Sequence, residues 1–239
     1  MKTMRKVVVT ALWVLSVAGV CFGASLPLPQ YPVLFIHGIN SDASTWADLR
    51  DLLINHGWTY GGSPRFMKAT NPTNDYVTGA SAGDFYTMNM SDYADPYRSQ
   101  NLTFEQQGYE LGMVVGRVKA VTGQPKVILV GHSMGGLAAR AYLEGLGFWD
   151  PARRMSYGND FANLVTVGTP NLGSPLAEIL PYVDALWVSE WFLGISAGSI
   201  ALAELDPTSS AFNILNNQPL PDGVHYASIV SWSRPALAY

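Results

Sequence analysis

The sequence has little cysteine, little charge and no internal repetition. Cys21 is its one cysteine, and it lies in an N-terminal segment that we expect to be removed. The mature chain would then have no thiol and no disulfide, so its stability must come from core packing. Only 13% of the residues are charged, the formal net charge is -4, and no basic cluster occurs beyond the extreme N-terminus. This composition excludes a nucleic-acid surface and indicates a small-molecule partner.

The N-terminus has the pattern of a secretory signal peptide. Three basic side chains within the first six residues precede an apolar run, Val7–Val20, and small residues follow up to a cleavage point after Gly23. We therefore expect residues 1–23 to direct the protein to a secreted or periplasmic location. The remaining residues, 24–239, suit one α/β domain with a large core and are too few for two.

Two alternatives for this N-terminal segment stay open. An uncleaved membrane anchor is disfavoured because the apolar run is short for a membrane span and Pro27 and Pro29 follow it at once. A lipoprotein signal is a minor alternative, because Val20 stands where a small residue should precede the lipidated Cys21.

The most informative stretch of the chain is residues 126–143. An apolar run of strand type breaks into Gly131-His132-Ser133-Met134-Gly135, and residues 136–143 have helical composition. Gly-x-Ser-x-Gly between a strand and a helix predicts a nucleophile elbow, in which Ser133 has a strained backbone and Gly131 and Gly135 lie where strand and helix crowd it. Ser133 would then lie at a helix N-terminus, whose free N–H groups favour developing negative charge.

Other segments predict the fold around this turn. Apolar runs typical of strands buried on both faces occupy residues 31–40 and 161–168, and a last strand is expected at 225–231. Helices are predicted over 41–56, capped by Asp42 or Ser44, and over 103–123, where Thr103 and Gln106 have capping-box spacing. Residues 58–95 read as loops around one short strand near 84–90. The fold class is therefore α/β, a doubly wound, mostly parallel sheet with helices on both faces.

Three motifs in this order resemble the bacterial-type triacylglycerol lipases of the α/β-hydrolase superfamily, over roughly residues 31–231. They are His37-Gly38, the segment 131–136, and Gly168-Thr-Pro-Asn-Leu-Gly-Ser174. The resemblance implies an α/β-hydrolase fold and hydrolysis of carboxylic esters of acyl lipids. It implies no cofactor and no catalytic metal. It also implies that the second oxyanion-hole N–H comes from Ile39, in the loop that contains Gly38, and the first from Met134.

Such lipases place a mobile lid after the third of these motifs. Residues 175–205 are apolar and aromatic here, and a lid with an apolar inner face would cover the serine in water and open on transient contact with a lipid interface. Plain core helices are the alternative, because a crossover connection is also due in this segment. Asp184 and Glu190 argue against a membrane span.

The acid and base of a catalytic triad are not found. In this superfamily the acid should follow the strand at 225–231 and the histidine one strand later, but the sequence given stops at Tyr239. None of the four histidines is well placed as the base: His37, His56, His132 and His225. Asp206 and Asp222 precede the last strand, and Arg234 stands near the expected acid, so the triad acid and histidine stay unknown. The expectation is that the C-terminal part of the fold is missing from this chain.

Three functional hypotheses remain. The leading one is a secreted lipase or esterase that forms an acyl-enzyme on Ser133. A deacylase or amidase of the same fold is the second. A non-catalytic or weakly active lipid-binding homologue is the third, and the lack of a base after Val230 favours it.

Overall fold

The described part of the chain is built on a five-stranded parallel sheet with the strand order β4-β1-β5-β8-β9. The computed structural model describes residues 26–90, 101–174 and 199–230. The strands of the sheet are β1 (Val33–Ile36), β4 (Phe85–Met88), β5 (Val127–His132), β8 (Phe161–Val167) and β9 (His225–Ile229). This arrangement confirms the predicted fold class, including the short strand expected near residues 84–90.

One face of the sheet is covered by two long helices, α3 (Phe104–Thr122) and α4 (Met134–Leu143). Thr103 and Gln106 form the predicted capping box at the start of α3, and Gly123 ends the helix in the left-handed conformation, with φ 69°. The two helices approach closely, because a Cβ at Gly108 would lie 2.9 Å from the backbone nitrogen of Tyr142. The core on this face contains the inward side chains of four strands, among them Leu34, Met88, Leu129 and Leu164.

The opposite face is covered by a 3₁₀ turn, η1 (Ala43–Trp46), and by α2 (Ala47–Asn55). Asp42 is the N-cap, because its carboxylate accepts a hydrogen bond from the Ser44 N–H at 2.7 Å. These elements pack over β1 and β4. Towards β8 and β9 they leave an apolar hollow of about 130 Å³, whose lining includes Ile128, Val130, Val165 and Ile229.

Two antiparallel hairpins correct the sequence prediction. Residues 58–95 were expected to be loops around one strand, but they also form β2 (Arg65–Met67) and β3 (Tyr76–Thr78) with the short 3₁₀ turn η2 (Pro72–Asn74) between them. A second hairpin joins β6 (Gly147–Asp150) to β7 (Arg153–Met155). Strands this short carry too few residues for an alternating pattern to reveal them.

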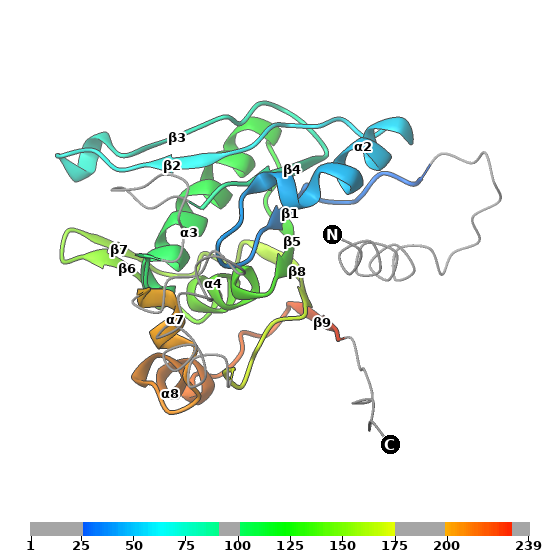
Figure 1. The fold of residues 1–239 in the computed structure, drawn as a ribbon. Helices are drawn as coiled ribbons and strands as arrows, with labels where there is room; N and C mark the ends of the chain where they lie inside the picture. The colour runs from blue at the N-terminus through cyan, green and yellow to red at the C-terminus, as the bar shows by residue number, and fades with distance from the viewer. Residues whose placement is uncertain (1–25, 91–100, 175–198, 231–239) are drawn as a thin grey trace, which may run out of the picture.

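Within the described part of the connection from β8 to β9 lie two short helices, α7 (Ile200–Glu204) and α8 (Ser210–Asn217). Figure 1 shows them beside α4, at the end of the molecule opposite the β2–β3 hairpin. Most of the predicted lid, residues 175–198, lies outside the described residues, as does the predicted signal peptide. None of the helices in the described ranges is long and apolar enough to cross a membrane.

Helix α7 contacts the start of α3 through a buried carboxylate. Glu204 accepts a hydrogen bond from the Phe104 N–H at 2.6 Å. Burial raises the pKa of Glu204 to about 7; the Phe104 N–H lowers it in part, and the nearby Glu105 raises it further. The folded state therefore favours the protonated carboxyl. Its contribution to the free energy of unfolding is fully present below about pH 4.5 and is lost as the pH rises to about 7.

We expect Glu204→Gln to be more stable than the wild type at pH 8 and about equal to it at pH 5. Glutamine keeps an oxygen for the Phe104 N–H and removes the cost of a buried charge. Thermal unfolding at the two pH values measures the difference. Asp222→Asn, at an exposed position before β9, is the matched control, because it removes a carboxylate that is not buried, and it should change the Tm little. A Tm difference for Glu204→Gln that is the same at both pH values would contradict the assignment.

Candidate active site

Ser133 occupies a tight turn between β5 and α4. Its backbone has φ 51° and ψ -124°, a conformation that costs on the order of 1–3 kcal/mol for a residue with a side chain. The turn is held on both sides: the Ser133 N–H donates to the Val167 carbonyl at 2.9 Å, and the Ser133 carbonyl accepts from the Gly136 N–H at 3.0 Å. The serine is therefore presented at the carboxyl end of the central strand and at the N-terminus of a ten-residue helix.

Three glycines leave no room for side chains around this turn. A Cβ at Gly131 would lie 2.6 Å from the backbone nitrogen of Gly136. A Cβ at Gly135 would clash with the His37 carbonyl at the end of β1, and a Cβ at Gly136 would clash with the side chain of Thr169. The elbow thus packs against β1, against the loop after β8 and against itself. The contact with Thr169 is the one that the sequence pattern did not predict.

The loop after β1 lies directly beside the serine. A Cβ at Gly38 would lie only 2.9 Å from the Cβ of Ser133. Ile39 is partly buried against the cluster that contains Met134, and Asn40 follows with a positive φ of 49°. The structure therefore brings Gly38 and Ile39 together with Ser133 and Met134, although almost a hundred residues separate the two pairs in the sequence. The N–H groups of Met134 and Gly135, the first two residues of α4, come too early in the helix to reach an intrahelical carbonyl.

Two histidines lie near Ser133, but the rings of both contact other residues. His37 is fully buried; its Nδ1 is 2.8 Å from the Gly38 oxygen and its Nε2 is 3.0 Å from the Met90 nitrogen. His132 packs edge-on against Trp46 with ring centroids 6.3 Å apart, and burial lowers its pKa. The Nδ1 of His132 is buried without a hydrogen-bond partner in the described part of the chain.

The other titratable candidates make contacts elsewhere or lie at the far end of the sheet. His56 ends α2, where its Nδ1 is 2.8 Å from the Leu52 oxygen. His225 and Asp222 lie at the amino end of β9, opposite the elbow. Asp206 follows α7 and accepts hydrogen bonds from Thr208 at 2.7 Å. Over residues 26–90, 101–174 and 199–230, no histidine hydrogen-bonds to the Ser133 hydroxyl, and no group of three His, Cys, Asp or Glu side chains could hold a metal ion.

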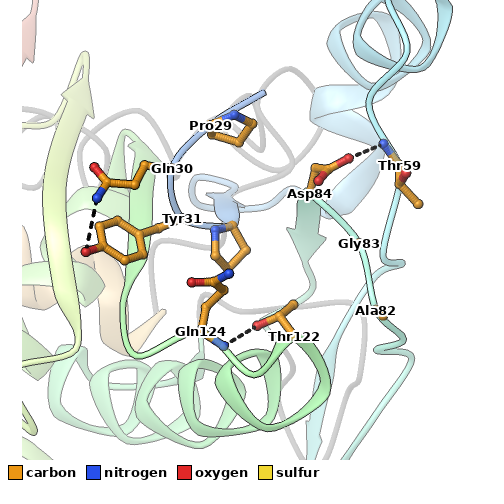
Figure 2. A pocket seen from close by; sticks show the side chains of 10 residues that line it. Pro29, Gln30, Tyr31, Thr59, Ala82, Gly83, Asp84, Thr122 and Gln124 are labelled. Atoms are coloured by element: carbon orange, nitrogen blue, oxygen red, sulfur yellow. Dashed lines mark hydrogen bonds between the residues drawn. The ribbon is translucent and has the colours of Figure 1, made fainter. Parts of the chain in front are cut away.

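A polar pocket of about 320 Å³ lies at the other end of the sheet (Figure 2). Its lining comes from the segments that precede β1, β4 and β5, including Tyr31, Asp84 and Gln124. Asp84 is engaged there, because its carboxylate accepts a hydrogen bond from the Thr59 N–H at 2.7 Å. Since Ser133 follows the carboxyl end of β5, this pocket does not belong to the same site.

The comparison with known proteins agrees with this geometry. A family model described as "Alpha/beta hydrolase family" matches residues 33–235, which include the elbow and the loop after β1. The chain belongs to the alpha/beta hydrolase family. The order β4-β1-β5-β8-β9, with the tight Ser133 turn after the central strand, is thus consistent with an alpha/beta hydrolase.

Two solved structures share this alpha/beta hydrolase fold. The lipase BlEst2 of Bacillus licheniformis, in its mature form, is 20% identical with a TM-score of 0.53; the match covers 85% of this chain and 69% of that one. The phospholipase PlaB of Legionella pneumophila is 19% identical with a TM-score of 0.53, and the match covers 83% of this chain and 38% of that one. At these identities the likeness establishes the fold alone.

Proposed function

We propose that this alpha/beta hydrolase is a secreted serine hydrolase that cleaves carboxylic esters of acyl lipids through an acyl-enzyme on Ser133. The Ser133 oxygen bonds to the ester carbonyl carbon, the alcohol leaves with the serine proton, and water then releases the acid. The N–H groups of Ile39 and Met134 stabilise the oxyanion that forms on the carbonyl oxygen. Export follows from the signal-peptide pattern of residues 1–23, and the lipid substrate brings transient contact with a lipid interface.

The observation that carries this proposal is the strained backbone of Ser133 beside Gly38. A positive φ at a serine persists only where the surrounding structure imposes it, and such strain concentrates at functional sites. Three glycine contacts and two backbone hydrogen bonds impose it here. The names of the two structural relatives, a lipase and a phospholipase, support acyl esters as the substrate class.

We expect a fluorophosphonate probe to form a covalent bond with the Ser133 oxygen, with loss of fluoride and the serine proton. Labelling should be slow, because no base contacts the hydroxyl in the described residues, although on the order of 10³-fold catalysis survives loss of triad members elsewhere. Mass spectrometry of the digested protein should locate the label at Ser133. Ser133→Ala and heat-denatured wild type should both remain unlabelled. Labelling of native protein at other serines only would refute the proposal.

A panel of p-nitrophenyl esters and matched amides then separates esterase from deacylase or amidase activity. A second candidate function is lipid binding without turnover, and the placement of the four histidines favours it. Fluorescence titration with a non-hydrolysable lipid analogue would show binding in both cases. Only a catalyst would also release p-nitrophenol from the esters, or p-nitroaniline from the amides, faster than Ser133→Ala does.

A further inference from the structure

The side chain of His37 connects the end of β4 to the loop that carries Gly38 and Ile39. Its ring is fully buried, and both nitrogens are engaged: Nδ1 with the Gly38 oxygen at 2.8 Å and Nε2 with the Met90 nitrogen at 3.0 Å. Met90 lies just beyond the end of β4, the strand that pairs with β1. A buried imidazole with two backbone partners has little freedom to rotate.

These contacts fix the tautomer of His37. The Met90 N–H can only donate a hydrogen bond, so the Nε2 atom accepts and carries no proton. The proton of the neutral ring is therefore on Nδ1, which donates to the Gly38 carbonyl. Burial lowers the pKa of His37 and keeps the ring neutral; the Gly38 carbonyl and Asp42 act in the opposite direction, and His132 adds to the lowering.

The strand order indicates which way the Gly38 carbonyl points within the sheet. β1 lies between β4 and β5, the His37 ring reaches towards β4, and Ser133 follows β5 on the other side. In a trans peptide the carbonyl and the N–H point in opposite directions. Holding the Gly38 carbonyl towards the ring therefore turns the N–H of Ile39 towards the β5 side, where Ser133 lies.

We propose that His37 is a positioning residue that aims the Ile39 N–H at the oxyanion site by holding the Gly38 carbonyl. This inference rests on the proposed function, because it assigns a task to the same site. A donor fixed before substrate arrives needs no rearrangement during reaction, which is the condition under which oxyanion donors are most effective.

A second contact tethers the far end of the same loop. Asn89, the residue before Met90, accepts a hydrogen bond from the Ala43 N–H through its side-chain oxygen at 2.7 Å. Between the two tethers the chain turns at Asn40 with its positive φ of 49°. Asn89 and Met90, which follow β4, thus fix both ends of the loop between His37 and Ala43.

Two substitutions separate the roles of the two ring nitrogens. The amide of His37→Asn lies near the position of Nδ1 and can donate to the Gly38 carbonyl, while the longer His37→Gln places its amide near Nε2 and can accept from Met90. We expect His37→Gln to lower the rate of Ser133 modification by a fluorophosphonate about 10- to 100-fold, since loss of an oxyanion donor costs on the order of 10²–10³. His37→Asn should stay within about threefold of the wild type.

Controls keep this test independent of folding and of the proposed function. Rates are compared at a temperature where Tm measurements show every variant folded. His56→Gln is the matched control, because His56 also contacts a backbone carbonyl but lies at the end of α2, and it should leave the rate unchanged. Equal losses in His37→Asn and His37→Gln would overturn the inference. If the wild type itself does not react at Ser133, the proposed function fails instead.

A spectroscopic measurement needs no activity. ¹⁵N NMR of the wild-type protein should show His37 as the neutral tautomer with its proton on Nδ1 at pH 7. A proton on Nε2, or a charged ring, would overturn the inference whatever the rates show.

Discussion

Gly131→Ala is expected to cost about 3 kcal/mol or more of the free energy of unfolding. Overpacking a close-packed site typically costs about 1–3 kcal/mol. Here the added Cβ would lie 2.6 Å from the backbone nitrogen and 2.7 Å from the Cα of Gly136, so no side chain can rotate away to relieve the clash. Relief requires movement of β5 relative to α4, and Ser133 lies between them. Urea denaturation should show a much lower midpoint, and reaction of Ser133 should be lost.

Gly116→Ala provides the matched control for this prediction. Gly116 lies in α3, is exposed, and has nothing within 4 Å of an added Cβ. Alanine should there stabilise the helix by about 0.5–1 kcal/mol. If Gly131→Ala unfolds at the same midpoint as the wild type, the elbow is less tightly packed than the contacts indicate.

Arg153→Ala is expected to destabilise the protein by about 3–5 kcal/mol, the usual cost of removing one partner from a buried ion pair. The Arg153 side chain is 5% exposed and pairs with Asp75, whose side chain is 2% exposed, at 2.6 Å. It also contacts Asp150 at 2.7 Å and donates to the Ala69 carbonyl at 2.6 Å. Its removal would leave Asp75 buried without its ion-pair partner. Chemical denaturation at pH 7 measures the loss.

The pH dependence tests the same pair. Burial alone would raise the pKa of Asp75, but hydrogen bonds from Arg153 and Ala69 hold it below its ordinary value. A depressed carboxyl pKa contributes stability above the unfolded pKa, and this contribution is lost as the pH falls. In Arg153→Ala the Ala69 N–H and the charge of Lys68 still lower the pKa of Asp75, but the hydrogen bonds and charge of Arg153 are lost, so the deficit relative to wild type should shrink in acid. Arg50→Ala removes an exposed pair with Asp51 and should change stability by less than about 0.5 kcal/mol. A loss of stability for Arg153→Ala at pH 7 that is as small as the loss for Arg50→Ala would contradict the prediction.

Sequence alone predicted the parts of the fold whose causes are local. β1 has all four residues buried, so its apolar run was continuous and recognisable. The capping box of Thr103 and Gln106 and the glycine at position 123 placed both ends of α3. The glycines of the elbow were predictable for the same reason, since a strained turn restricts the residues next to it.

Features that depend on distant contacts were missed. The β2–β3 and β6–β7 hairpins are connected by Arg153 and Asp75, which are 78 positions apart. Helix α8 was also missed, although its signal was present: the Ser209 hydroxyl accepts from the Phe212 N–H, and Phe212 and Leu215 form its buried face. The orientation of His37 likewise depends on β4, which joins β1 only in the folded sheet. No local pattern contains the pairing of Arg153 with Asp75 or the contact of His37 with the end of β4.

The packing around the elbow has a consequence for directed evolution of this enzyme. The backbone at Gly131, Gly135 and Gly136 faces three different parts of the fold, so a saturation library at these positions would contain almost no folded members. Ile39 differs, because the proposal assigns a task to its amide and none to its side chain, which is only partly buried. Under the proposed function, screening effort aimed at altered acyl preference is therefore best spent on Ile39.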